Sequence, residues 1–304
     1  MKKNTKFLLL LLLLSTYNLT AQEDESPITY EIGSFNVTVL PEGSGQRKAD
    51  ILIGATQEML NQYLPKGTYT SAVNAFLIET DDKTVLVDAG YGKKLLANLE
   101  ICGKSPEKID IILLTHMHGD HIGGLLQNNK KSFPNAMLYI PQFEYDYWMN
   151  NEIMQNLPEN RRGSFTQARK VIEAYKNNII LFISGELDGI THEVFPGIRS
   201  VAAYGHTPGH TVYLLESDSH RFMIWGDLTH VTPIQAAYPQ IAVTYDTDPV
   251  KAVESRQHIL QYLSDNKIDI AGMHIEYPGI GKLSKSKSGG YTFTLTCDCE
   301  GVVR

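Results

Sequence analysis

The chain has 304 residues, and its 42% hydrophobic and 20% charged residues are typical of a globular enzyme. This composition excludes a disordered or collagen-like chain. The net charge of −7 lacks the basic excess of a nucleic-acid-binding protein, so we expect no nucleic-acid partner.

Residues 1–21 resemble a secretory signal peptide. Three lysines within the first six residues precede a leucine run at residues 8–14, and Ala21 ends a short polar stretch. The apolar run is shorter than the roughly 20 residues that a transmembrane helix needs. We therefore expect cleavage after Ala21 and export of residues 22–304 to the periplasm or the medium, without a membrane anchor. A retained interfacial anchor is the alternative.

Residues 22–304 predict a single α/β domain. Alternating or continuous apolar residues predict strands at 28–40, 72–79, 84–87, 109–114, 137–140, 179–183, 199–203, 212–215, 222–225 and 268–272. A turn is expected at 42–45. Helices are expected at 95–102, 142–150, 165–175 and 249–265, with another that starts at 122–126. Many strands with helices between them, in a chain without a linker, indicate two packed sheets with helices outside.

The chain has three cysteines, Cys102, Cys297 and Cys299. An oxidising compartment permits disulfides, but an odd number leaves at least one thiol outside any bridge within the chain. A bridge from Cys102 to either of the other two remains open.

Metal-binding side chains are concentrated directly after the apolar run 109–114. The sequence THMHGDHIGG supplies His116, His118, Asp120 and His121 within six residues. Imidazole and carboxylate ligands suit zinc and similar divalent metals, and the absence of a thiolate here argues against a closed structural site. Four such close ligands exceed what one metal normally takes from one loop, so we expect two metals.

This H-x-H-x-D-H segment resembles the signature of the metallo-β-lactamase-fold hydrolase superfamily. Further landmarks resemble that superfamily in the expected order: VDAG at 87–90, GHTPGHT at 205–211, WGD at 225–227 and MH at 273–274. The resemblance covers residues 71–281. It implies an αββα sandwich with a dinuclear metal site at one edge of the two sheets.

The resemblance also implies the ligands, which form one set for each metal and one shared carboxylate: His116, His118 and His206; Asp120, His121 and His274; and Asp227. We expect two Zn²⁺ per chain, although Mn, Fe or Co accept the same ligands. Two cations about 3.5–4 Å apart can share a hydroxide and lower its pKa toward 7. Asp120 and Asp227 are therefore expected to be catalytic as well as metal-binding.

Neighbouring residues have expected supporting roles. Asp88 is expected to hydrogen-bond a ligand imidazole. His210, the second histidine of the GHTPGH segment, is expected to be structural, because the family pattern binds metal through the first. The aromatic stretch 143–149, within an insertion at 141–162, either packs as a helix face or walls an apolar pocket beside the metals.

The run HIEYPGIG at residues 274–281 resembles the corresponding ending of methyl parathion hydrolase and its relatives. That group includes secreted lactonases that open N-acyl homoserine lactones. The resemblance implies a lactonase in which the metal-bridging hydroxide attacks a small lactone or ester with an apolar tail. The alternatives are an organophosphate triesterase and a non-catalytic metal-binding protein. A homodimer remains open.

His230 is a further catalytic candidate. In many cytoplasmic lactonases of this kind, the third residue after the bridging aspartate is a tyrosine that contacts the substrate, and here that position, counted from Asp227, is His230. A neutral or protonated imidazole there can donate to the carbonyl oxygen or to the departing alkoxide. The alternative is a loop histidine that bonds only the main chain.

Overall fold

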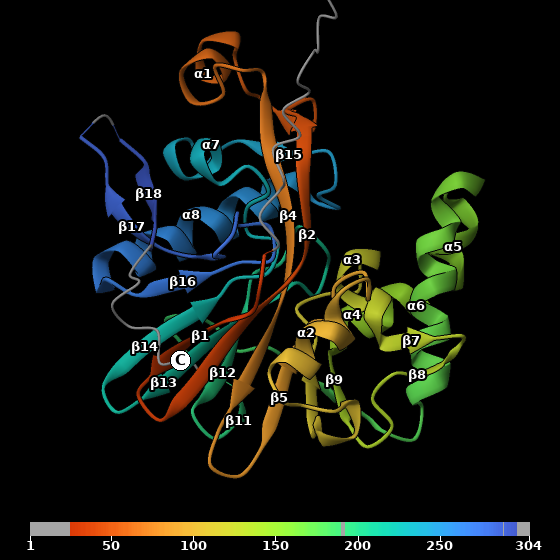
Figure 1. The fold of residues 1–304 in the computed structure, drawn as a ribbon. Coiled ribbons are helices and arrows are strands. Elements are labelled where there is room, and N and C mark those ends of the chain that lie inside the picture. The colour runs from red at the N-terminus through yellow and green to blue at the C-terminus, as the bar shows by residue number, and fades with distance from the viewer. Residues whose placement is uncertain (1–24, 190–191, 288, 297–304) are drawn as a thin grey trace, which may run out of the picture.

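The computed structural model describes residues 25–189, 192–287 and 289–296. Two seven-stranded sheets pack face to face, and helices lie on the outer face of each (Figure 1). This arrangement confirms the predicted αββα sandwich.

The first sheet has mixed pairing. Its strands in spatial order are β1 (Ile28–Ile32), β2 (Phe35–Lys48), β4 (Thr68–Glu79), β5 (Thr84–Val87), β6 (Ile111–Leu113), β9 (Met137–Pro141) and β10 (Ile179–Phe182). β5, β6, β9 and β10 run parallel to one another. Their carboxyl ends therefore meet at one edge of the sheet.

The second sheet contains a shorter parallel pair. Its strands in spatial order are β11 (His192–Phe195), β12 (Ile198–Ala202), β13 (Thr211–Ser217), β14 (His220–Ile224), β16 (Asp269–Ala271), β17 (Ile280–Lys285) and β18 (Tyr291–Leu295). β14 and β16 are parallel, and β13 is antiparallel to β14. The start of β13 consequently lies beside the end of β14.

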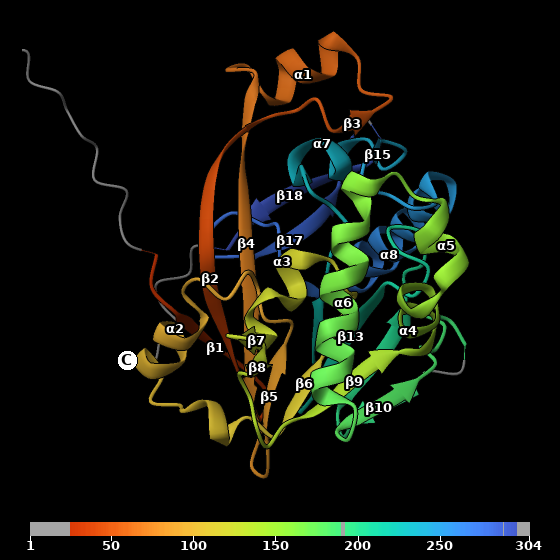
Figure 2. The same ribbon diagram turned by 90° about the vertical axis from the view of Figure 1, so that its right-hand side faces the viewer.

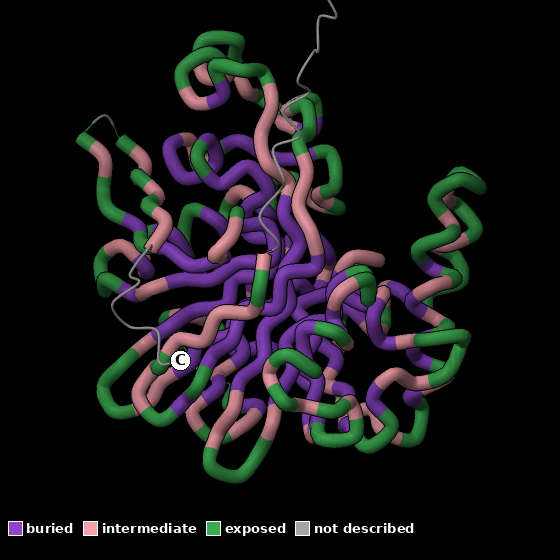
Figure 3. Tube along the Cα trace, in the orientation of Figure 1, coloured by how far each residue is buried: buried purple, intermediate pink, exposed green. Residues whose placement is uncertain are grey.

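Apolar side chains hold the four layers together. α2 (Leu95–Ile101), α4 (Gln142–Met149) and α6 (Arg162–Tyr175) pack on the first sheet, and α8 (Pro249–Asn266) packs on the second (Figure 2). Between the sheets, Phe76 and Ile78 share a buried cluster with Tyr213 and Phe222. The buried part of the chain is concentrated where the strands of the two sheets face each other (Figure 3).

β2 and β4 extend beyond the first sheet as a two-stranded arm (Figure 1). The arm connection carries β3 (Leu52–Ile53) and α1 (Gln57–Tyr63), and it packs against α7 (Thr232–Ala237) and β15 (Ala242–Val243). Ile51 and Leu64 of the arm connection share an apolar cluster with Ile234 of α7. The arm thus lies beside the loop that follows Asp227.

The turn predicted at residues 42–45 is wrong, because β2 continues to Lys48 with a bulge after Pro41. The Glu42 side chain points inward and is 3% exposed, and it accepts main-chain hydrogen bonds from Lys93 (2.8 Å) and Lys94 (2.9 Å). A tertiary contact therefore keeps the strand intact where the local composition favours a turn.

The helix predicted to start at 122–126 is also wrong. α3 (Gly119–Ile122) already ends there, and a 3-10 segment (Gly123–Leu125) leads into the hairpin of β7 (Leu126–Gln127) and β8 (Lys130–Lys131). A Cβ on Gly124 would lie 2.2 Å from the carbonyl oxygen of Ala89. This close approach fixes the path of the chain after the loop at residues 115–118.

The remaining elements are α5 (Asn151–Asn156) and 3-10 segments at Pro106–Lys108 and Glu159–Arg161. The predicted signal peptide and the pairing of Cys297 or Cys299 fall outside the described residues. Cys102 lies half-buried at the end of α2. Within the described part of the chain, no helix has the length and hydropathy needed to cross a bilayer.

Candidate metal centre

The predicted ligands lie on loops at the ends of neighbouring strands. The loop with His116 follows β6, and Asp227 and His274 follow the parallel strands β14 and β16. His206 precedes β13, whose start lies beside the end of β14. The strand order therefore brings ligands from distant sequence positions to one edge of the sandwich.

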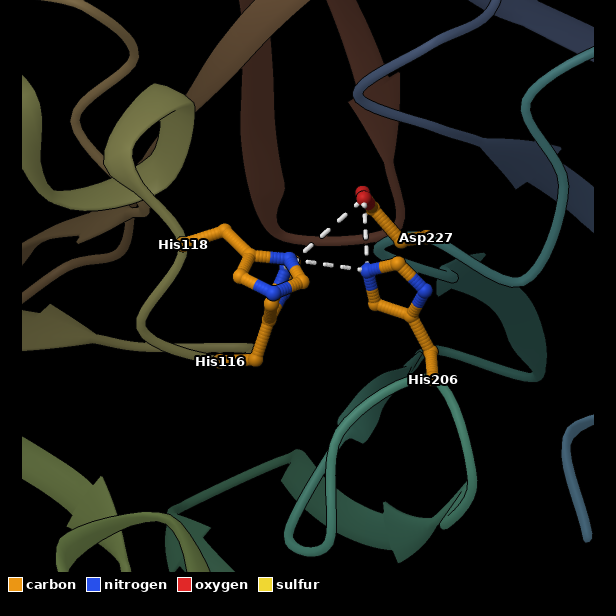
Figure 4. Close-up of side chains that lie close together, drawn as sticks. All are labelled: His116, His118, His206 and Asp227. Atoms are coloured by element: carbon orange, nitrogen blue, oxygen red, sulfur yellow. Dashed lines mark hydrogen bonds and ion pairs between the residues drawn. The ribbon is translucent and has the colours of Figure 1, made fainter. Parts of the chain in front are cut away.

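Four side chains converge on one point: His116, His118, His206 and Asp227 (Figure 4). Nδ1 of His118 lies 3.0 Å from Nε2 of both His116 and His206. Oδ2 of Asp227 lies 3.2 Å from Nε2 of His206 and 3.6 Å from Nε2 of His116. Ligands at zinc-bond length in tetrahedral geometry stand about 3.3 Å apart, so this spacing fits a zinc ion.

A second group beside the first contains Asp120, His121 and His274, whose ligand atoms lie within 4.8 Å of one another. Nε2 of His121 is 3.1 Å from Oδ1 of Asp227, and Nε2 of His274 is 3.1 Å from Oδ2. Asp120 lies farther out, 3.8 Å from His121 and 3.6 Å from His274. Asp227 contacts both groups, as expected of a bridging carboxylate.

Unpaired buried atoms also indicate a cation. Nε2 of His121 and Oδ1 of Asp227 are buried and lie 3.1 Å apart, yet neither makes a hydrogen bond of good geometry with any described residue. Leaving such an atom unpaired costs about 1–3 kcal/mol, so these cases are rare. A divalent ion that accepts nitrogen and oxygen ligands would satisfy both atoms. The seven predicted ligands thus lie together, and their chemistry fits two metal ions.

The charge states of several ligands suit a metal. Burial, together with His121, lowers the pKa of His116 well below its usual value, and burial with His206 lowers the pKa of His118 to about 3. Burial alone would raise the pKa of Asp227, but His121 and His274 hold it well below its usual range. Neutral imidazoles and an ionised carboxylate are the forms that bind metals.

Asp88 orients His121 through the other ring nitrogen. Oδ2 of Asp88 lies 2.6 Å from Nδ1 of His121 and accepts a 2.6 Å hydrogen bond from the Thr115 hydroxyl. Asp88 has a φ of 55°, which is uncommon for a non-glycine residue. This geometry confirms the role predicted for Asp88. Such an outer contact fixes the ring orientation of a ligand.

Two further histidine ligands, His206 and His274, also have oriented rings. Nδ1 of His206 lies 3.0 Å from Oδ1 of Asp246, and Nδ1 of His274 lies 2.7 Å from the carbonyl oxygen of Ala72. The sequence did not predict Asp246, because it lies 40 residues from His206 and belongs to no recognisable motif.

His210 lies behind the ligand groups, as predicted. Its Nδ1 is 2.9 Å from the Ala203 carbonyl oxygen, and its Nε2 accepts a 2.9 Å hydrogen bond from the main-chain N–H of Asp227. Burial, with His206, lowers the pKa of His210 to about 3, so its ring is neutral. One nitrogen therefore donates and the other accepts, and His210 fixes the main chain at Asp227.

His230 stands between the ligand groups and a cavity. Its Nε2 lies 3.1 Å from Oδ2 of Asp227, and its ring stacks on His274 with centroids 4.7 Å apart. Its buried Nδ1 has no hydrogen-bond partner, so neither ring nitrogen bonds the main chain of the described residues. Burial lowers the pKa of His230 to about 4, although Asp227 opposes this shift. The ring is therefore neutral near pH 7.

A cavity of about 360 Å³ adjoins His230 and His274. Leu64 at the arm, Phe293 and Leu295 on β18, and Ile275 supply apolar lining. A second cavity of about 620 Å³ lies along α4, with residues including Phe143, Tyr147 and Ile153 in its wall. None of the seven predicted ligands lines this second cavity.

The aromatic insertion is divided between the core and the wall of the cavity along α4. Trp148 is 3% exposed and packs on Phe165, with ring centroids 4.7 Å apart, so it walls neither cavity. Of the two alternatives for the stretch 143–149, Trp148 therefore follows the first and packs as a helix face, whereas Phe143 and Tyr147 line the cavity along α4, away from the predicted ligands.

Glu144 is a buried acid that the sequence did not reveal. Its carboxylate accepts hydrogen bonds from the main-chain N–H of Met117 (3.1 Å) and Gly209 (2.9 Å) and from the indole of Trp148 (2.7 Å). Burial raises its pKa, and these donors oppose the shift. Glu144 ties the loop of His116 and His118 to the loop of His206, but no local motif marks it.

A family model described as the metallo-beta-lactamase superfamily matches residues 68–267, about two thirds of the chain. The chain belongs to the metallo-β-lactamase superfamily. The two-sheet fold and the paired His/Asp groups are those of a metal-dependent hydrolase of this superfamily.

Several metallo-β-lactamase-fold proteins resemble the chain closely in structure. A hydrolase named AbOPH has a TM-score of 0.82 and 27% identity, over 90% of this chain and 99% of that chain. AidC, a dizinc quorum-quenching lactonase in complex with the product N-hexanoyl-L-homoserine, has a TM-score of 0.79 and 26% identity, over 90% and 98% of the two chains.

Sequence matches to curated relatives are more partial. An N-acyl homoserine lactonase of Bacillus sp. is 23% identical over 169 residues, which is 47% of this chain and 58% of that protein. The chain spans between about a fifth and about three fifths of the length of the curated relatives that it matches.

Proposed function

We propose that this protein is a dinuclear zinc hydrolase that opens N-acyl homoserine lactones. The observation that carries the proposal is Asp227, which joins two ligand groups beside an apolar cavity bordered by His230 and His274. The likeness to the dizinc lactonase AidC, over 98% of that chain, supports this substrate class.

Two cations in these groups would activate a water for attack and polarise the lactone carbonyl. The protein's residues would then position the reactants. Asp120 is 23% exposed at its side chain, so the lactone would approach past it. Neutral His230 has one ring N–H; if this N–H is on Nε2, which lies 3.1 Å from Oδ2 of Asp227, it would be shared between that carboxylate and a substrate oxygen.

The apolar tail would lie in the cavity between the arm and β18. Its lining includes Leu64, Ile275 and Leu295, and it begins at His230 and His274. Each buried methylene would contribute about 0.8 kcal/mol, or about a fourfold gain in affinity. The cavity along α4 lacks this direct border with the ligands.

We also propose that residues 22–304 are exported, because three lysines and a leucine run precede Ala21. N-terminal sequencing of the protein from its native host should begin near Gln22. A protein that retains Met1 would contradict export.

The proposed reaction is tested with purified, zinc-supplemented protein. Hydrolysis of N-hexanoyl-L-homoserine lactone is compared with hydrolysis of an aryl dimethyl phosphotriester, and bound metal is measured in parallel. We expect ring opening of the lactone to have the higher kcat/KM.

The variant His118→Ala should lose this activity, whereas the surface control His258→Ala should retain it. Faster hydrolysis of the phosphotriester would assign the second activity instead. Two bound metals with neither activity would indicate a metal-binding protein without this catalysis.

A further inference from the structure

Arg256 of α8 is a buried cation behind the metal centre. The residue is 1% exposed, and its Nε donates to the Leu228 carbonyl oxygen at 2.7 Å. Its Nη1 donates to the carbonyl oxygens of Pro239 (3.1 Å) and Ile241 (2.7 Å). A buried charge is costly unless its donors are satisfied. Here three carbonyl groups from two separate loops accept hydrogen bonds from Nε and Nη1, and the Asp246 carboxylate lies 4.0 Å from Nη2.

One branch of these contacts leads to His206. Nη2 of Arg256 lies 4.0 Å from Oδ2 of Asp246, and Oδ1 of Asp246 lies 3.0 Å from Nδ1 of His206. Oδ2 of Asp246 also accepts the main-chain N–H of Val243 at 2.9 Å. The carboxylate is therefore held on both oxygens, and it turns Nε2 of His206 toward the first ligand group.

The other branch leads to Asp227 and His230. Leu228, whose carbonyl Arg256 binds, directly follows Asp227. The Ile241 carbonyl also accepts a 3.1 Å hydrogen bond from the Gln235 amide. The side-chain oxygen of Gln235 accepts the main-chain N–H of His230 at 2.7 Å. The same guanidinium thus constrains the loop with the bridging carboxylate.

We propose that Arg256 is a positioning residue of the metal centre, which holds the His206 loop and the Asp227–His230 loop in one fixed relation. One loop precedes β13 and the other follows β14, so the open end of this antiparallel hairpin places them side by side, and both contribute ligands to the same cation group. A planar guanidinium can bind several acceptors at fixed angles, which a lysine ammonium cannot reproduce. The proposal rests on metal binding by the proposed function and is independent of which ester is hydrolysed.

The test measures metal binding in Arg256→Gln, Arg256→Lys and Asp246→Asn. Apoprotein is titrated with Zn²⁺ against a competing chelator, and the absorption spectrum of the Co²⁺-loaded protein reports the ligand geometry. Loss of an outer contact typically lowers metal affinity by about 10–100-fold. We expect a loss of this size at one of the two sites in each variant, with an altered Co²⁺ spectrum.

Arg199→Gln is the matched control, because Arg199 forms a partly exposed ion pair with Glu216 at 3.1 Å on the second sheet. It should keep both the affinity and the spectrum. The losses from Arg256→Lys and Asp246→Asn should also be non-additive in the double variant, because they act on one path to His206.

Wild-type affinity and spectrum in folded Arg256 variants, with only a lower Tm, would show that Arg256 is structural and overturn the proposal. Additive losses of metal affinity in the double variant would refute the claim that Arg256 acts on His206 through Asp246. If Arg256→Gln does not fold, Arg256→Lys and the double variant still decide between these results. Wild-type protein that binds no metal would instead refute the proposed function.

Discussion

The substitution Gly209→Ala tests whether the His206 loop must touch α4 directly. A Cβ at Gly209 would lie 2.4 Å from the main-chain nitrogen of Glu144 and 2.9 Å from the main-chain carbonyl carbon of Phe143. Ordinary contact begins near 3.4 Å, so the loop and α4 must separate by about 1 Å. α4 cannot yield easily, because Trp148 is packed on Phe165.

The structure gives the size of the effect. Separation would break the 2.9 Å hydrogen bond from Gly209 to Glu144 and displace His206, three residues away. Overpacking costs about 1–3 kcal/mol, and a hydrogen bond to a charged group contributes about 1.5–3 kcal/mol. We expect a loss of about 2.5–6 kcal/mol in the free energy of unfolding, which lowers Tm by roughly 5–20 °C. A 1 Å displacement of the centre should also lower kcat/KM about 100-fold.

Thermal unfolding and the lactone assay measure both effects, and Gly163→Ala is the control. Gly163 lies in α6 with open space around its Cβ position, so alanine there should raise stability by about 0.5–1 kcal/mol and leave activity unchanged. If Gly209→Ala keeps the wild-type Tm and kcat/KM, the steric argument is wrong. Equal destabilisation by both alanines would also refute it, since the effect would then not depend on the contact with α4.

Three further outcomes follow from the site. Leu295→Ala should lower kcat/KM several-fold more for decanoyl substrates than for butanoyl substrates. Ile153→Ala, in the other cavity, should change kcat/KM equally for both substrates. The reverse pattern would assign the acyl tail to the cavity along α4. Burial opposes protonation of His206, but its contacts with Asp227 and Asp246 raise its pKa to about 9. A proton therefore competes with the metal for this ring, and zinc affinity should increase between about pH 6.5 and 9. Chelator competition that shows no increase in zinc affinity over this range would contradict the prediction. His230→Ala should keep two metals and lower kcat by about 10²–10⁴-fold. The pH dependence of kcat near neutrality should not change, because the His230 ring is already neutral there. Full kcat in the metal-loaded variant would exclude a donor role for His230.

The sequence predicted those parts of the protein that local patterns determine. The apolar run at 109–114 became buried strand β6, and the ligand segment after it lies where a strand end places it. Asp88 and His210 also occupy the roles predicted from their motifs. In each case the residue and its function share one short segment of chain.

The errors arise where a distant contact decides the local structure. β2 passes through the predicted turn because Glu42 binds the start of α2. The short helix α3 ends early because Gly124 packs against the turn after β5. Neither contact leaves a periodic pattern in the sequence, so propensity gave the wrong result.

The supporting residues of the site were missed for the same reason. Glu144, Asp246 and Arg256 act on loops far from them in sequence, through contacts that only the folded chain creates. The sequence left the aromatic stretch 143–149 open between a core and a pocket wall, and the packing of Trp148 on Phe165 places this side chain in the core. Sequence alone gives the chemistry of the ligands, whereas the fold gives their orientation.

The most direct test of the central claim is the rate of lactone opening as a function of bound zinc. Metal-free protein is titrated with Zn²⁺, and hydrolysis of N-hexanoyl-L-homoserine lactone is followed at each metal-to-protein ratio. The two groups joined by Asp227 predict that full activity requires the second equivalent of metal. Full activity at one equivalent, or no ring opening at two, would contradict a dinuclear lactonase.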